Sequence, residues 1–117
     1  MMTFEFHAES VSPSEQTVVV PPDIENKKEL FTFLAQLIPL PDYFGKNWDA
    51  LEECLTDLSW LPERKLTLAH VGLPLQGEPA NQRTYLQLLA SAAKETPNLR
   101  VVFPERCRNE VERILAA

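Results

Sequence analysis

Some segments of this chain have the apolar pattern of a strand, and others have apolar residues at the spacing of a helix. Prolines separate many of these segments. Residues 17–20 (TVVV) form a β-branched run closed by two prolines, which is typical of a short buried strand. Residues 65–71 (KLTLAHV) and 99–103 (LRVVF) are closed by glycine or proline and predict two further strands. Residues 3–7 (TFEFH) also alternate and form a candidate edge strand.

Apolar residues at helical spacing occupy the intervals between these strands. They predict helices over residues 27–38, 47–58, 80–95 and 105–115. Asn26 stands three residues before Glu29 in the form of an N-cap box, and Pro39 ends the first helix because proline cannot donate a backbone hydrogen bond. Strands that alternate with helices are typical of a parallel sheet with right-handed crossovers. The predicted fold class is therefore α/β.

The overall composition is that of one ordinary globular domain. The chain has 117 residues, of which 44% are hydrophobic and 24% are charged, so we expect a single core over residues 1–117. Its apolar runs are shorter than the ~20 residues that a membrane span needs. The N-terminal segment MMTFEFHAES lacks the basic and then apolar order of a signal peptide. We therefore expect a cytoplasmic protein that makes no contact with a membrane.

Residues that commonly carry catalysis or bind metals are few and scattered. Cys54 and Cys107 have no metal-ligand spacing and fall on the apolar sides of predicted helices, so free thiols are expected. His7 and His70 lie in predicted strands, where structural or surface roles are favoured. The sequence contains no glycine-rich phosphate loop, no G-x-S-x-G motif and no HExxH motif. We therefore expect no cofactor, no bound metal and no enzymatic activity.

One predicted helix and the turn before it carry most of the net charge. The chain has a net charge of -6, and residues 42–57 contain five carboxylates against a single lysine, a net charge of -4. Apolar residues at i, i+3, i+4 and i+7 form the stripe that should face the core: Leu51, Cys54, Leu55 and Leu58. Asp49, Glu53 and Asp57 repeat every four residues on the other side, where like charges destabilise a helix by about 0.2–0.5 kcal/mol per pair. A basic partner would relieve this repulsion.

Two interpretations of this segment remain open from the residues alone. Aromatic rings beside charged groups are typical of binding hot spots, and Tyr43, Phe44 and Trp48 lie beside the carboxylates. However, a charged helix face is more often only solvated, and the rings could instead close the turn onto the core. The acidic balance also argues against non-specific binding of nucleic acid.

The segment LPDYFGKNWDALEECL, residues 40–55, resembles the signature of the barstar family of intracellular ribonuclease inhibitors. That signature is roughly L-P-[DE]-Y-[YF]-G-x-N-x-D-A-L-x-[DE]-C-L. The segments TVVV, TYLQLLASAAKE and LRVVF also match, so the resemblance covers residues 17–103. It implies a three-stranded parallel sheet, with the strands in chain order, packed against helices. The helix after Pro104 would then be an addition, which could cap the core or make an oligomer contact.

Members of that family insert the acidic helix and its preceding loop into the active site of a small basic ribonuclease. The resemblance therefore implies inhibition of a basic ribonuclease or ribonuclease-type toxin, without direct contact to nucleic acid. By matching position it implies partner contacts from seven residues: Tyr43, Asn47, Trp48, Asp49, Glu52, Glu53 and Thr56. Asp49 and Glu53 would be the central charges.

Three positions differ from one member of the family. That member has an aspartate where this chain has Glu53, a tryptophan where it has Glu52, and a glutamate on the third helix where it has Ser91. The differences at Glu52 and Ser91 would move negative charge toward the second helix and away from the third. They leave open a second hypothesis, a barstar-like interaction or immunity module that binds a basic partner other than a ribonuclease. An acidic mimic of nucleic acid is a third and weaker hypothesis.

Overall fold

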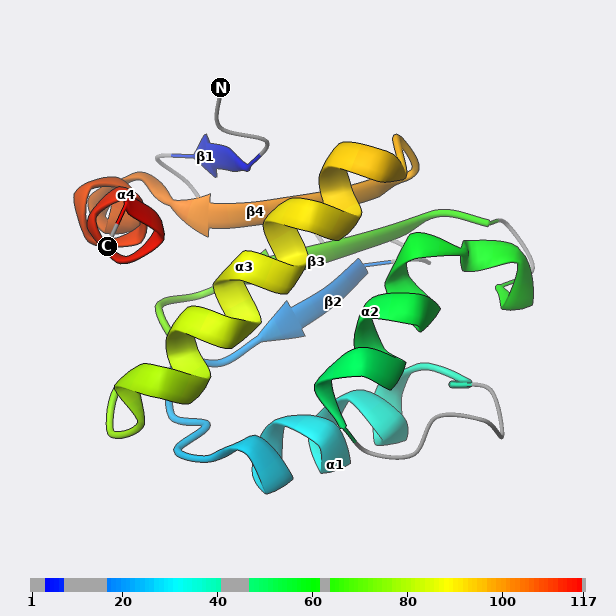
Figure 1. Ribbon diagram of the computed structural model, residues 1–117, viewed down its shortest axis with the longest axis horizontal. Coiled ribbons are helices and arrows are strands. Elements are labelled where there is room, and N and C mark those ends of the chain that lie inside the picture. The colour runs from blue at the N-terminus through cyan, green and yellow to red at the C-terminus, as the bar shows by residue number, and fades with distance from the viewer. Residues whose placement is uncertain (1–3, 8–16, 41–46, 62–63, 117) are drawn as a thin grey trace.

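The computed structural model describes residues 4–7, 17–40, 47–61 and 64–116. Four strands form one sheet in the order β1-β4-β3-β2: β1 (Glu5–His7), β2 (Thr17–Val20), β3 (Leu66–His70) and β4 (Leu99–Pro104). Every pairing is parallel, as Figure 1 shows. The predicted α/β class and the three neighbouring parallel strands are confirmed. The candidate edge strand also forms and adds a fourth strand beside β4.

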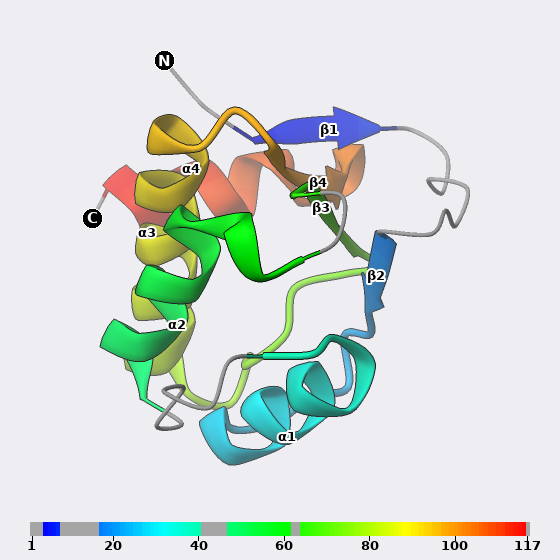
Figure 2. The same cartoon turned by 90° about the vertical axis from the view of Figure 1, so that its right-hand side faces the viewer.

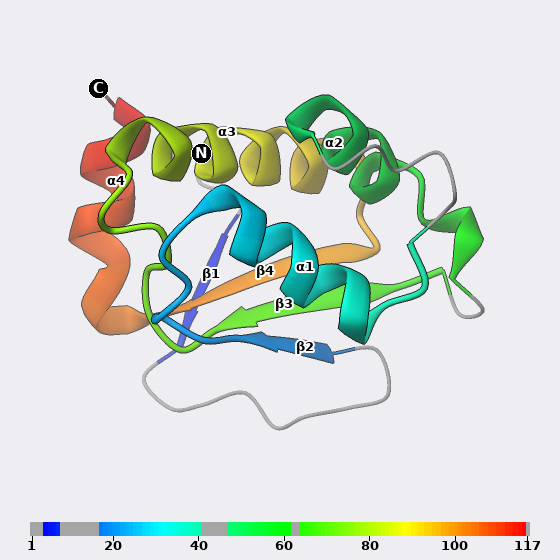
Figure 3. The same ribbon diagram turned by 90° about the horizontal axis from the view of Figure 1, so that it is seen from below.

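Three helices lie on one face of this sheet, and a fourth lies near the end of β4 (Figures 1 and 3). Their bounds are α1 (Lys27–Leu37), α2 (Trp48–Thr56), α3 (Pro79–Glu95) and α4 (Arg108–Ala116). Short 3-10 turns at Leu58–Trp60 and Glu105–Cys107 follow α2 and precede α4. Figure 2 shows α2 lying alongside α3, with α1 below them. Helix α2, which carries the acidic residues, therefore lies on the same face of the sheet as α1 and α3.

Asparagine side chains cap α1, as the sequence predicts, and also α2. Asn26 Oδ1 accepts a hydrogen bond from Glu29 N at 2.9 Å. Asn47 Oδ1 accepts one from Ala50 N at 2.8 Å. Each bond satisfies an amide that the first turn of a helix leaves without an intrahelical partner. The predicted starts of α1 and α2 are therefore confirmed.

Removal of either cap should cost a similar amount of stability. We expect Asn26→Ala and Asn47→Ala each to lower the free energy of unfolding by about 1 kcal/mol, because one backbone donor loses its acceptor. Urea denaturation measures this change. Asn26→Asp and Asn47→Asp keep the acceptor and serve as controls that should stay near the wild-type midpoint. Alanine variants as stable as the wild type would contradict the capping role.

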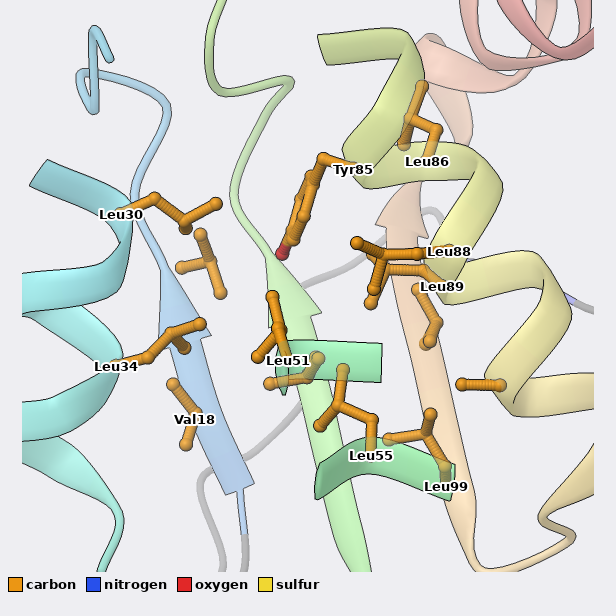
Figure 4. Packing of buried hydrophobic residues seen from close by; sticks show 14 of the residues in the cluster. Val18, Leu30, Leu34, Leu51, Leu55, Tyr85, Leu86, Leu88, Leu89 and Leu99 are labelled. Carbon is orange, nitrogen blue, oxygen red and sulfur yellow. The ribbon is translucent and has the colours of Figure 1, made fainter. Parts of the chain in front are cut away.

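The apolar stripe of α2 is buried as predicted. Leu51 and Cys54 have no exposed surface, Leu55 is 1% exposed and Leu58 is 4% exposed. Figure 4 shows Leu51 and Leu55 pointing into a cluster that also receives side chains from the sheet and from α1 and α3: Val18, Leu30, Leu34, Tyr85, Leu86, Leu88, Leu89 and Leu99. Burial of such side chains stabilises a fold by roughly 1.5–3 kcal/mol each. The stripe therefore fixes which side of α2 faces outward.

The segments at the two ends of the described chain pack against the sheet near β4. The rings of Phe4 and Phe6 lie 5.3 and 6.4 Å from the ring of Phe103 on β4. The Arg108 guanidinium at the start of α4 lies 4.5 Å from the centre of the Phe6 ring, and Val111 on α4 is fully buried. Of the two roles considered for the C-terminal helix, packing against the core is the one that these contacts support.

Candidate functional site

The acidic groups of α2 project away from its buried stripe. Asp49 and Glu53 are exposed, whereas Glu52 and Thr56 are partly buried. Together with residues nearby they line an open groove of about 730 Å³, which we call the acidic groove: Asp49, Glu52, Glu53, Thr56, Asp57 and Glu95. Among the described residues that line it, all but Thr56 carry a carboxylate and none is basic. The groove therefore presents a strongly negative surface.

The far end of the groove is held by two hydrogen bonds. Thr96 Oγ1, just after α3, donates to the Thr56 carbonyl at the end of α2. Asp57 Oδ1 accepts from Ser59 N at 3.0 Å and so caps the following 3-10 turn. This backbone donor, the largest of the causes, lowers the pKa of the Asp57 carboxyl below its ordinary value. Asp57 therefore serves the fold as well as the surface.

The central carboxylates of the groove are not paired with basic side chains in the described part of the chain. The acid–arginine pairs found there join other elements: Glu5 with Arg100, Glu105 with Arg108 and Glu110 with Arg113. None of the ion pairs in these residue ranges includes Asp49, Glu52 or Glu53. Anions on an exposed helix without such partners can accept charge-assisted hydrogen bonds from another molecule.

Trp48 occupies a different position from the carboxylates that follow it. Its ring packs edge-on against Phe31 of α1 at 5.1 Å and lies 6.2 Å from the ring of Tyr85 on α3. Its indole Nε1–H donates to Asn81 Oδ1 at 3.3 Å. Trp48 is only partly exposed, so most of its ring contacts the protein itself. Trp48 is the first residue of α2, and these contacts hold it against α1 and α3.

The seven residues expected at the site are placed unevenly. Tyr43, with the loop around it, lies outside the described residues. Asn47 is exposed at the N-cap of α2. Asp49, Glu52, Glu53 and Thr56 line the acidic groove together.

Asp57 also lines the groove, although it was not among the expected partner contacts, and a further lining residue, Glu95, was not expected there at all. It lies on the last turn of α3, one helical turn beyond Ser91. Spacing of four residues from Ser91 was the signal that could have identified it, since such residues share a helix face. Helix α3 therefore still places a carboxylate beside α2, that of Glu95, although it has Ser91 at the expected position.

A buried polar pair lies beneath the helices. His70 Nδ1 is 3.1 Å from the Val102 carbonyl and must donate to it, so Nε2 accepts from the Tyr85 hydroxyl at 2.7 Å. The His70 ring also stacks on Phe103 at 4.1 Å. Burial lowers the pKa of His70 from 6.5 to about 4 and raises the pKa of Tyr85 above its ordinary value. His70 is therefore a neutral core residue, as the structural role predicted for it requires.

Comparison with protein families identifies the family of this chain. The model of a family described as Barstar (barnase inhibitor) matches residues 16–106. The chain belongs to the barstar family. The matched range agrees with the resemblance found over residues 17–103. Comparisons with curated proteins and with solved structures found no match.

The barstar-family match separates the core of the fold from its additions. Members of this family bind barnase-type ribonucleases, and the match includes α2, α3 and the whole acidic groove. Strand β1 and helix α4 lie outside the matched residues.

The described residues contain no group of three or more His, Cys, Asp or Glu side chains placed to hold a metal ion. Within the same ranges, every helix is too short or too polar to cross a bilayer.

Proposed function

We propose that this barstar-family protein inhibits a basic ribonuclease by covering the enzyme's active site with the acidic groove and the loop before α2. The observation that carries the proposal is the exposure of Asp49 and Glu53 on a helix whose opposite side is fixed in the core. The proposed contacts are those expected from the sequence, with Glu95 added: Tyr43, Asn47, Trp48, Asp49, Glu52, Glu53, Thr56 and Glu95.

Electrostatics support this mode of inhibition. A ribonuclease active site holds cationic side chains that bind the phosphates of RNA, and the carboxylates of the groove can occupy the same positions. The isolated protein keeps its like charges close together on α2, and the partner's cations would relieve their repulsion. Because opposite charges attract at long range, association should be steered and fast. The inhibitor would act by exclusion of substrate, without a chemical step.

The direct test is titration of barnase-type ribonucleases with the protein while RNA cleavage is followed. We expect cleavage to fall to the background at a one-to-one ratio with at least one such enzyme. The association rate should fall steeply as salt rises from roughly 10 mM to 1 M, because the Debye length shrinks from about 30 to 3 Å. Cleavage that stays unchanged with every enzyme of this type would remove the proposal.

A second candidate function is binding of a basic protein that is not a ribonuclease. Two features favour it: Glu52 stands where one member of the family has tryptophan, and Glu95 adds a carboxylate beside α2. Because specificity depends on which charges stay unpaired in the wrong complex, these changes could select a different cationic surface. Capture from an extract with the wild type and with Asp49→Ala/Glu53→Ala as bait separates the two. A nuclease captured only by the wild type supports inhibition, and an unrelated basic protein supports the second function.

A further inference from the structure

A chain of hydrogen bonds joins the first turns of three helices. Trp48, the first residue of α2, donates its indole N–H to Asn81 Oδ1 at 3.3 Å. Asn81, in the first turn of α3, donates through Nδ2 to Glu78 Oε1 at 3.0 Å. The same carboxylate oxygen accepts from the backbone N–H of Lys27, the first residue of α1, at 3.3 Å. Asn81 is the central link of this chain.

The carboxylate of Glu78 links helices instead of capping its own. Glu78 occupies the N-cap position of α3, but its side chain makes no capping bond there. Its Oε1 atom binds Lys27 N and Asn81 Nδ2, which lie on two different helices. This use of an N-cap carboxylate ties α1 to α3, and Asn81 extends the tie to α2.

The position between Glu78 and Trp48 requires a side chain that both donates and accepts. Glu78 is a carboxylate and can only accept, whereas the Trp48 indole N–H can only donate. An amide provides both groups in one plane, which a leucine or an aspartate cannot do beside Glu78. The identity of Asn81 is therefore matched to its two neighbours.

The start of α2 depends on these contacts for its position. Helix α2 has nine residues, and helices this short are marginal without tertiary contacts. Its end is fixed by the bond from Thr96 Oγ1 to the Thr56 carbonyl. Its beginning is fixed by Trp48, whose ring packs on Phe31 and whose N–H binds Asn81. Asp49 follows Trp48 directly, so a shift of Trp48 would move that carboxylate.

We infer that Asn81 is a positioning residue for the acidic groove, although it lies outside the groove itself. It holds Trp48 in place and thereby fixes the first turn of α2 in the orientation in which Asp49 meets a cation of the partner. The inference rests on the proposed function for the identity of that partner. Its local part, the ordering of α2, can be measured in the free protein.

The test compares a variant that breaks the chain of hydrogen bonds with a double variant in which the donor and the acceptor exchange places. Asn81→Leu keeps the number and branching of the side-chain heavy atoms but removes both hydrogen bonds. Asn81→Asp combined with Glu78→Gln exchanges donor and acceptor between the two positions, so the bonds to Trp48 and Lys27 can still form. Val111→Ala on α4 is the control, because Val111 is buried and belongs to a helix outside this chain of bonds.

Two measurements are made on each protein: amide hydrogen exchange at residues 51–53, and the dissociation rate of the complex with the inhibited ribonuclease. For Asn81→Leu we expect both rates to rise by about tenfold, the effect of losing the hydrogen bond that holds Trp48 on α2. The double variant should stay within about twofold of the wild type. Val111→Ala should speed exchange in all helices together and leave the dissociation rate unchanged.

Wild-type rates of exchange and dissociation in Asn81→Leu would overturn the inference. The inference would also be overturned if the dissociation rate rose as much in Val111→Ala as in Asn81→Leu. A loss of overall stability would then be enough to explain the effect of Asn81→Leu. If the wild type binds no ribonuclease, the proposed function fails, and exchange at residues 51–53 alone decides whether Asn81 orders α2. The two failures are therefore distinguishable.

Discussion

Asp49→Ala and Glu53→Ala are each expected to weaken the complex with a basic ribonuclease by at least about 2 kcal/mol, or about 30-fold in Kd. Each substitution leaves a cation of the partner buried without its anion, and that uncompensated charge is costly. Both residues lie in the acidic groove, on the exposed side of a helix that the core fixes. Most of the loss should appear in the dissociation rate, which stopped-flow or surface-binding kinetics can measure.

A matched control separates local contact from net charge. Glu112→Ala removes the same charge from α4, far along the chain from the groove, and should change mainly the association rate, and only slightly. Glu53→Ala should leave the free energy of unfolding unchanged or slightly higher, since it removes repulsion from Asp49 and Asp57. If Glu112→Ala weakened the complex as much as Glu53→Ala, the groove would not be the contact surface.

Acid is expected to destabilise the fold through His70, by about 3 kcal/mol in total. The folded protein holds the imidazole neutral, because burial lowers its pKa from 6.5 to about 4. The unfolded chain takes up a proton below pH 6.5, so the unfolded state binds more protons there. The contribution of this group to stability is therefore constant above about pH 6.5, falls by about 1.4 kcal/mol per pH unit toward pH 4, and then levels off. Urea unfolding at a series of pH values measures the slope.

His70→Gln is the control for this slope. The amide keeps a donor for the Val102 carbonyl but does not titrate, so the dependence between pH 6.5 and 4 should flatten whatever the variant's absolute stability. Glu5 acts mainly in a lower window: the hydrogen bond from Arg100, opposed by partial burial, leaves the pKa of Glu5 lowered from 4.5 to about 2. Its stabilising effect is present above pH 4.5 and is lost as pH falls toward 2. An unchanged slope in His70→Gln would show that another group is responsible.

Local patterns were sufficient to predict the elements of this fold. A cap such as Asn47 acts on an amide three residues away, and the stripe from Leu51 to Leu58 reports burial directly through its spacing. Parallel order followed from the alternation of strands and helices. These features depend on residues close together in the chain, so the sequence alone determines them.

Features that join distant segments could not be predicted in the same way. Trp48 and Asn81 are 33 residues apart, and only the packing of α2 on α3 brings the indole N–H to the amide. Glu95 reaches the acidic groove for the same reason. The hydrogen bond between His70 and Tyr85 likewise needs β3 and α3 to be placed first. Charge and periodicity identified the acidic helix, but not the residues that surround it.

Because Asp49 and Glu53 take no part in the packing of α2, natural selection can alter them without loss of the fold. If the proposed partner changed its cationic surface, substitutions on this helix alone could follow that change, one charge at a time. The leucines on the other side would keep the scaffold constant through such an exchange. Because the acidic face and the buried stripe of α2 are separate, related proteins could share one architecture while each binds a different partner.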